Sequence, residues 1–231
     1  MTYAPASDRD DDRVVGASRR HDPPADGRDR CMIYAPRVEL QELARGLWRW
    51  AAPHPDWEPR KEEDDPADWA QDVGCVAYAA SDALVLIDPL VGGDDYDALD
   101  QLADTKQKVA ILTTIEWHAR SGGELTKRYD ASTTAPQDVE PVEISGAGET
   151  MFWIGEHRAL VPGDRLLGDR PPGVRMCPPS WLRYLDGFTH EDLRRALRAK
   201  LLELPIELVL VSHGEPVLRD GRAAVESALA Q

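Results

Sequence analysis

The chain has 231 residues, of which 42% are hydrophobic, and its 27 basic and 42 acidic side chains give a net charge of −15. A chain of this length can bury one substantial core, so we expect a single domain with a tail. The negative charge argues against a nucleic-acid partner, because phosphate binding requires a basic surface. No apolar run reaches the ~20 residues of a membrane span, and the N-terminus lacks the apolar core of a secretory signal. We therefore expect a soluble, cytoplasmic protein without a membrane partner.

The first segment, residues 1–30, is rich in Asp, Arg and Pro and nearly empty of large apolar side chains. Such a segment buries too little surface to offset its ordering entropy, so we predict a disordered tail. Residues 31–231 are assigned to the folded domain. The three cysteines, Cys31, Cys75 and Cys177, are scattered along the chain. Their spacing indicates neither a disulfide framework nor a clustered zinc motif.

Strand patterns dominate the first part of the domain. Residues 38–52 fit either an amphipathic helix or two short strands around a turn. Residues 73–90 contain two β-rich runs on either side of a polar connection. Residues 94–103 carry apolar side chains at helical spacing and lead into the next strand.

A polar loop between a predicted strand and a predicted helix is the most informative stretch. An apolar run that ends in Thr113-Thr114 predicts a buried strand, and residues 116–120 (EWHAR) predict a loop. Ser121, with Glu124 three residues later, predicts a capping box at the start of a helix. Loops at the carboxyl ends of strands in α/β folds commonly carry ligands, so we expect any site to centre on this loop.

The second part of the domain begins with strands and ends with helices. Residues 141–161 predict three short strands, and residues 176–187 and 190–203 predict helices. A closing strand leads to a loop that contains His213, and residues 218–230 form a terminal helix. This alternation of strands and helices is consistent with an α/β fold.

Several short motifs occur in an order that resembles metallo-β-lactamase-fold hydrolases, especially their hydroxyacylglutathione-hydrolase-like branch. The motifs are D-P-L at Asp88, G-G at Gly122, G-D at Asp164 and H-G-E-P at His213, and the resemblance covers about residues 38–230. It implies a four-layer αββα sandwich of two mixed sheets flanked by helices. The loops that contain these motifs would form one edge, where that family has its active site.

The metal-binding signature of that family is largely absent. In the family, H-x-H-x-D-H-x-G-G supplies ligands for a pair of zinc or iron ions. When this signature is aligned on the glycine pair, its four ligand positions hold Ile115, Trp117, Ala119 and Arg120. A later loop of the family carries a fifth ligand, and that position holds Ala147. Only Asp164 and His213 remain of seven positions, and two ligands cannot hold a catalytic zinc ion.

The leading hypothesis is therefore a non-hydrolytic or weakly active pseudoenzyme that binds a small molecule or a partner at the former metal site. It needs no metal cofactor. Arg120 is predicted to pair with Asp164 in place of the ion. The predicted pocket consists of Asp88, Glu116, Trp117, Arg120, Asp164 and His213.

The alternative hypothesis is a metal-dependent hydrolase of esters or thioesters with a rebuilt mononuclear site. One zinc, iron or manganese ion would be held by Glu116, His118, Asp164 and His213. Asp164, His213 and His118 are then the candidate catalytic residues. Glu116 and His118 would share one face if the strand continued through them. Each of these residues could instead be an ordinary loop or turn residue, and the sequence decides neither the substrate nor the oligomeric state.

Overall fold

A computed structural model describes residues 38–59, 69–93, 95–170 and 173–230. The predicted tail and Cys31 lie outside these residues. Two sheets and a separate hairpin organise the described part of the chain. The sheets have the strand orders β1-β2-β3-β4-β5 and β11-β8-β7-β6, and β9 pairs with β10.

The five-stranded sheet contains the N-terminal strands. They are β1 (Gln41–Ala44), β2 (Leu47–Pro53), β3 (Asp72–Ala79), β4 (Leu84–Ile87) and β5 (Val109–Leu112). Its first four strands pair antiparallel, whereas β4 and β5 are parallel. The connection from β4 to β5 contains helix α1 (Asp97–Ala103), and helix α2 (Gly122–Tyr129) follows β5. Residues 38–52 thus form two strands rather than a helix, and Gly46 makes the turn between them with φ of 78°.

The second sheet is also mixed, because β11 runs parallel to β8 while the other pairs are antiparallel. Its strands are β6 (Glu140–Ile144), β7 (Glu149–Ile154), β8 (Ala159–Val161) and β11 (Leu208–Val209). The hairpin of β9 (Leu166–Asp169) and β10 (Gly173–Met176) lies between β8 and helix α3 (His190–Leu201). Helix α4 (Gly221–Ala228) follows β11. The described ranges also contain the 3-10 turns η1 (Glu116–Ala119), η2 (Gly155–His157) and η3 (Pro179–Leu182).

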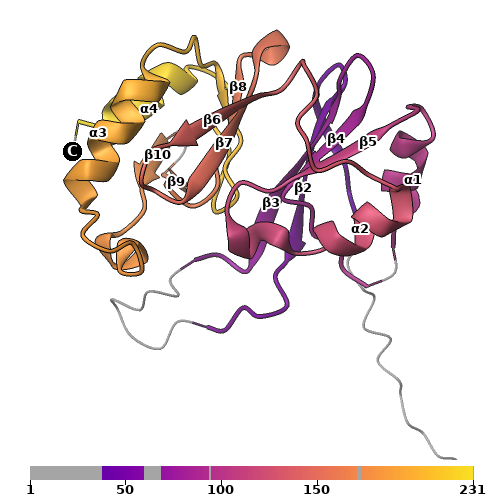
Figure 1. The fold of residues 1–231 in the computed structure, drawn as a ribbon, viewed down its shortest axis with the longest axis horizontal. Helices are drawn as coiled ribbons and strands as arrows, with labels where there is room; N and C mark the ends of the chain where they lie inside the picture. The colour runs from indigo at the N-terminus through magenta and orange to yellow at the C-terminus, as the bar shows by residue number, and fades with distance from the viewer. Residues whose placement is uncertain (1–37, 60–68, 94, 171–172, 231) are drawn as a thin grey trace, which may run out of the picture. The chain divides into compact units, whose positions relative to one another are not determined.

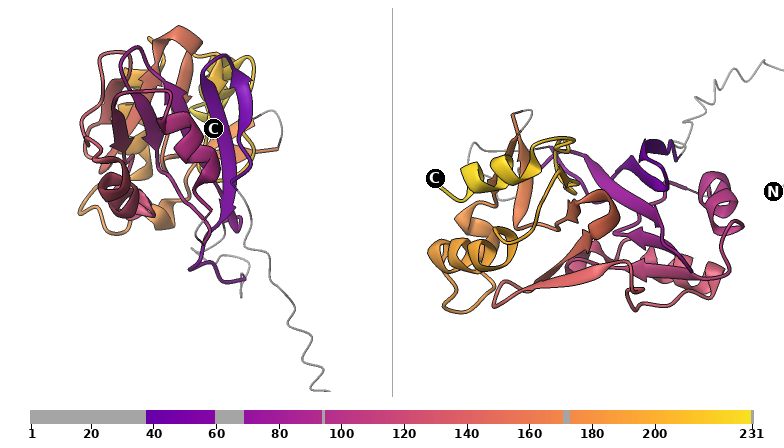
Figure 2. Two further views of the ribbon diagram at one scale, coloured as in Figure 1. Left: turned by 90° about the vertical axis from the view of Figure 1, so that its right-hand side faces the viewer. Right: turned by 90° about the horizontal axis from the view of Figure 1, so that it is seen from above.

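Alternating side chains of the strands build the layers. In β4, Leu84 and Leu86 pack in a cluster with Leu99 of α1 and Leu125 of α2. The intervening residues of β4 face the second sheet, in a cluster that contains residues of β7, β8 and the β11 region. Figures 1 and 2 show α1 and α2 outside the first sheet, and α3 and α4 outside the second. The predicted αββα sandwich is confirmed.

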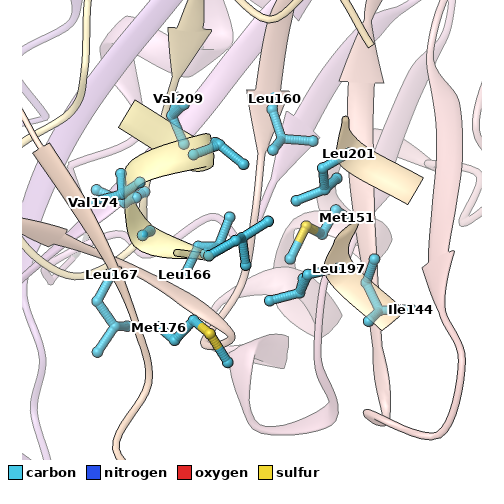
Figure 3. Close-up of a cluster of buried hydrophobic side chains, with 14 of the residues drawn as sticks. Ile144, Met151, Leu160, Leu166, Leu167, Val174, Met176, Leu197, Leu201 and Val209 are labelled. Atoms are coloured by element: carbon cyan, nitrogen blue, oxygen red, sulfur yellow. The ribbon is translucent and has the colours of Figure 1, made fainter. Parts of the chain in front are cut away.

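The third apolar cluster fills the space between the second sheet and helices α3 and α4 (Figure 3). Leu193, Leu197 and Leu201 of α3 are fully buried there, because their spacing places them on one helical face. A capping box begins this helix, in which Thr189 and Asp192 each accept from the other's backbone N–H. The predicted helix at residues 190–203 is confirmed.

Two local predictions were wrong. Residues 176–187 form no α-helix: Met176 ends β10, and the helical part is the single turn η3. The sequence Cys177-Pro-Pro explains this, since a residue before proline is driven out of the helical conformation. Helix α2 does begin after Ser121, but without the capping box, because the Ser121 hydroxyl accepts from the Val91 N–H at 3.0 Å. None of the helices in the described ranges is long and apolar enough to cross a membrane.

Candidate metal centre

The loops that follow β4, β5, β8 and β11 bring four polar side chains together. Asp88 follows β4 directly, His118 lies in η1 after β5, and Asp164 lies in the loop after β8. The fourth, His213, comes from the loop after β11. That loop is held against β3, because the Ser212 carbonyl accepts from the Gly74 N–H at 2.7 Å. All four side chains are buried despite their polarity.

Two imidazoles meet one carboxylate oxygen at the centre of this group. His118 Nε2 lies 3.1 Å from Asp164 Oδ1, and His213 Nε2 lies 3.2 Å from the same oxygen. The ligand-type atoms of these three residues all lie within 4.8 Å of one another. Their exposed fractions are only 3%, 4% and 9% for His118, Asp164 and His213. Buried imidazoles and a carboxylate that share one point have the chemistry and spacing of a metal site.

Asp88 fixes the orientation of the His118 ring. The His118 Nδ1 hydrogen bonds to Asp88 Oδ2 at 2.9 Å, and Thr114 donates to both oxygens of Asp88, from Oγ1 at 2.5 Å and from its backbone N–H at 2.8 Å. A carboxylate that accepts from one ring nitrogen leaves the other nitrogen free to bind an ion. Asp88 therefore directs Nε2 of His118 towards Asp164.

Glu149 holds the loop that carries Asp164. Its buried carboxylate accepts three backbone N–H groups, those of Gly163, Asp164 and Arg165, at 3.0, 2.7 and 2.9 Å. A side chain at Gly163 would not fit, since its Cβ would lie 2.6 Å from Thr114 Oγ1 and 2.9 Å from Glu149 Oε2. The sequence analysis missed Glu149. The sequence feature that could have indicated Glu149 is its acidic side chain at the start of a strand, two positions after Ala147.

Burial and charge shift the pKa values of these groups in opposite directions. Burial alone would lower the pKa of His118, but its contacts with Asp164 and Asp88 outweigh burial and raise the pKa to about 9. Burial would raise the pKa of Asp164, yet the two imidazoles hold it well below its usual value. Burial dominates at the other two groups, lowering the pKa of His213 and raising that of Glu149 to about 7.

Glu116 lies outside this cluster, although it was among the expected ligands. Its side chain is exposed, whereas His118, two residues later, is buried. The prediction that the two residues share a face assumed an extended strand. The chain instead turns into η1, where the His118 N–H donates to the Ile115 carbonyl at 2.8 Å. In a 3-10 helix, residues two apart point in different directions.

The predicted pair between Arg120 and Asp164 was also wrong. The Arg120 guanidinium donates to Ser212 Oγ at 2.6 Å and to the carbonyl oxygens of Asp88 and Gly74 at 3.0 and 3.3 Å. These bonds tie together the loops that carry Asp88 and His213. Arg120 thus connects the loops of the site and leaves Asp164 to the imidazoles.

A cavity of about 430 Å³ opens above the three central residues. Its walls are mainly aromatic: Trp69 and Trp181 lie edge-on to the His213 ring at 5.2 and 5.9 Å, and Trp117 and Tyr184 contact each other at 5.0 Å. Four predicted pocket residues line the cavity, namely Trp117, Arg120, Asp164 and His213. Of the other two, Asp88 lies behind His118 and Glu116 is exposed. The sequence did not single out the other three rings, because they come from distant segments.

Solved structures with a similar fold include metallo-β-lactamases. One from Erythrobacter litoralis is 14% identical, with a TM-score of 0.52 over 84% of this chain and 91% of that chain. An NDM/FIM-1-like metallo-β-lactamase from the same organism, in a mono-zinc form, is 13% identical, with a TM-score of 0.51 over 86% and 98%. DIM-1 metallo-β-lactamase is 10% identical, with a TM-score of 0.51 over 84% and 99%.

No protein-family model and no curated protein matches the sequence. The structural matches nevertheless agree with the order of sheets and helices described above. The chain has the metallo-β-lactamase fold, as its sequence motifs indicated. At these identities the likeness establishes the fold alone, and the hydroxyacylglutathione-hydrolase-like branch stays a prediction.

Proposed function

We propose that the protein is a metal-dependent hydrolase with one divalent ion held by His118, Asp164 and His213. The observation that carries this proposal is the convergence of three buried ligand atoms within 4.8 Å. Moreover, His118 Nε2 and Asp164 Oδ1 are both buried and face each other at 3.1 Å, and His213 Nε2 faces the same oxygen at 3.2 Å. A divalent ion at the shared point would take the place of a proton between these groups, since metal ligands bind in their deprotonated forms.

The donor set suits one catalytic ion. Catalytic zinc sites commonly use three protein ligands and keep one position open, and two imidazoles with a carboxylate also suit iron or manganese. Such an ion supplies Lewis-acid polarisation of a carbonyl and lowers the pKa of its water. This proposal follows the alternative sequence hypothesis, with three of its four ligands and without Glu116.

The residues around the ligands support this chemistry. Asp88 keeps His118 Nε2 directed at the shared point, and Glu149 fixes the Asp164 loop through three backbone bonds. The aromatic walls would bind the apolar or aromatic part of a substrate and exclude water from it. We therefore propose an ester or thioester with a flat apolar group as the substrate. A glutathione thioester is a further candidate on the sequence resemblance alone.

Hydrolysis of matched substrates tests this function. Protein loaded with zinc, iron(II) or manganese would be compared with His213→Ala on aryl esters, aryl thioesters and a glutathione thioester. We expect turnover that requires the ion and falls at least 100-fold in His213→Ala, since two ligands do not retain a catalytic ion. Metal-loaded protein that hydrolyses none of these substrates would contradict the proposal.

A second candidate is the ligand-binding pseudoenzyme of the leading sequence hypothesis. One observation favours it: the Trp117 indole N–H donates to Asp164 Oδ2, so this carboxylate already has a protein partner. In that case the aromatic cavity would bind a small molecule without any ion. Binding of an aryl carboxylate to metal-free protein, with no zinc taken up at micromolar concentrations, would favour this candidate.

A further inference from the structure

We propose that Trp117 is a positioning residue that holds Asp164 Oδ2, so that this carboxylate offers an ion Oδ1 alone. The inference rests on the proposed metal site and goes beyond it. It assigns a role to a side chain that the sequence motif places at a lost ligand position. It also predicts how the remaining carboxylate binds.

The two oxygens of Asp164 have different surroundings. Oδ1 faces Nε2 of both His118 and His213, at 3.1 and 3.2 Å. Oδ2 accepts the indole N–H of Trp117. Because an indole nitrogen is only a donor, it cannot replace the carboxylate as a ligand and can only fix its orientation. The arrangement therefore leaves one oxygen of Asp164 directed at the point that the imidazoles share.

The Trp117 ring is held in place although 46% of its surface is exposed. Tyr184 contacts the ring edge-on at 5.0 Å, and the guanidinium of Arg165 lies 5.8 Å from its centroid. Arg165 is fully buried and donates to the Tyr184 hydroxyl and, at 3.0 Å, to the Ala147 carbonyl. Edge-to-face and cation–π contacts of this kind stabilise a ring orientation. Tyr184 and Arg165 thus keep the indole N–H directed at Asp164.

The same turn also delivers a ligand. Trp117 and His118 are neighbours in η1, and the short helix sends one side chain to Asp164 Oδ2 and the other to Oδ1. A carboxylate with one oxygen occupied binds an ion through the other oxygen only. With two imidazoles this gives three protein donors and leaves room for water or substrate, as in catalytic sites.

The test compares Trp117→Phe with Trp48→Phe. Both variants keep an aromatic ring and lose one indole N–H, but Trp48 lies in β2, packs against the apolar cluster of the first sheet and does not line the cavity. Zinc affinity would be measured by calorimetry, and the coordination number would be read from the absorption spectrum of bound cobalt(II).

We expect one zinc ion in the wild-type protein and about 10- to 100-fold weaker binding in Trp117→Phe, as is typical when a group that supports a ligand is lost. Trp48→Phe should bind zinc like the wild type. The cobalt spectrum of Trp117→Phe should show weaker d–d bands, because the freed Oδ2 can join the coordination. Equal affinity and equal spectra for wild type and Trp117→Phe would overturn the inference and leave the metal site standing. Equal weakening in both variants would overturn it too.

A measurement on the wild-type protein covers the case of a Trp117→Phe variant that does not fold. The indole N–H resonance of Trp117 should be protected from exchange with water, both in metal-free and in zinc-loaded protein. Rapid exchange in the zinc-loaded state would overturn the inference. Wild-type protein that binds none of zinc, iron(II) and manganese would instead refute the proposed function, and the role of Trp117 in metal binding with it.

Discussion

The two loops that supply the central ligands differ in how closely they follow the family motif. The loop after β8 keeps Gly163-Asp164, and Asp164 lies where the motif implies. The loop after β5 has none of the motif's ligands, yet it places His118 against Asp164 through the turn η1. The comparison teaches that the direction of the backbone, as much as the spacing of residue types, decides which side chain reaches a site.

The loop after β8 should be the more sensitive to substitution, because its geometry depends on one buried acceptor. Replacing Glu149 with Ala leaves three buried N–H groups without their carboxylate. We expect a loss of about 3 kcal/mol in the free energy of unfolding, measured with urea. Glu143→Ala, at an exposed position of β6, is the control. A loss below 1 kcal/mol for Glu149→Ala would show that the loop does not depend on this group.

Gly163→Ala is a second test of the loop after β8, because it adds a single methyl group to the packed part of that loop. In Gly163→Ala the new Cβ would meet Thr114 and Glu149 below 3.0 Å, so we expect about 1–3 kcal/mol of destabilisation and weaker zinc binding. Gly123→Ala is the matched control, because no atom lies within 4 Å of its Cβ position in α2. Thermal unfolding and calorimetry would measure both effects. Equal stability of the two variants would contradict the close packing.

The support of His118 in the loop after β5 is tested by Asp88→Asn. Asp88 has φ of 49°, a conformation that asparagine also tolerates, so the change removes the charge and keeps the shape. We expect about 10- to 100-fold weaker zinc binding, as for other losses of a carboxylate behind a ligand histidine. The exposed Asp82→Asn should bind zinc like the wild type. Unchanged zinc affinity in Asp88→Asn would show that Asp88 does not support metal binding by His118.

The smallest effect is expected at Glu116. Its side chain is exposed and outside the cluster, so Glu116→Ala should change the unfolding free energy by less than about 0.5 kcal/mol. Zinc affinity should stay within twofold of the wild-type value. A tenfold loss of affinity would instead restore Glu116 as a ligand and contradict the direction of the η1 turn.

Much of the fold could be predicted from the sequence. The continuous apolar runs of β4 and β5 and the helical spacing in α3 are local patterns, and the motif order then indicated the αββα arrangement. The prediction failed where local signals compete. Ser121 has the features of a capping residue, but its hydroxyl is used by the N–H of Val91, a contact between segments distant in the chain.

The candidate site was less accessible to sequence reasoning. Asp164 and His213 match motif positions. His118 was predicted only as a ligand of the alternative rebuilt site, with an extended strand assumed where the structure has the 3-10 turn that places it. Glu149 acts through backbone N–H groups, which leave no trace in residue spacing. The aromatic walls come from three segments that only the fold brings together.

The central claim is that His118, Asp164 and His213 bind one ion. Crystals grown with zinc and measured at its absorption edge would test it most directly. The account predicts a single anomalous peak about 2.1 Å from His118 Nε2, Asp164 Oδ1 and His213 Nε2. A peak elsewhere, a second peak on Asp164 Oδ2, or no peak among these side chains would contradict it.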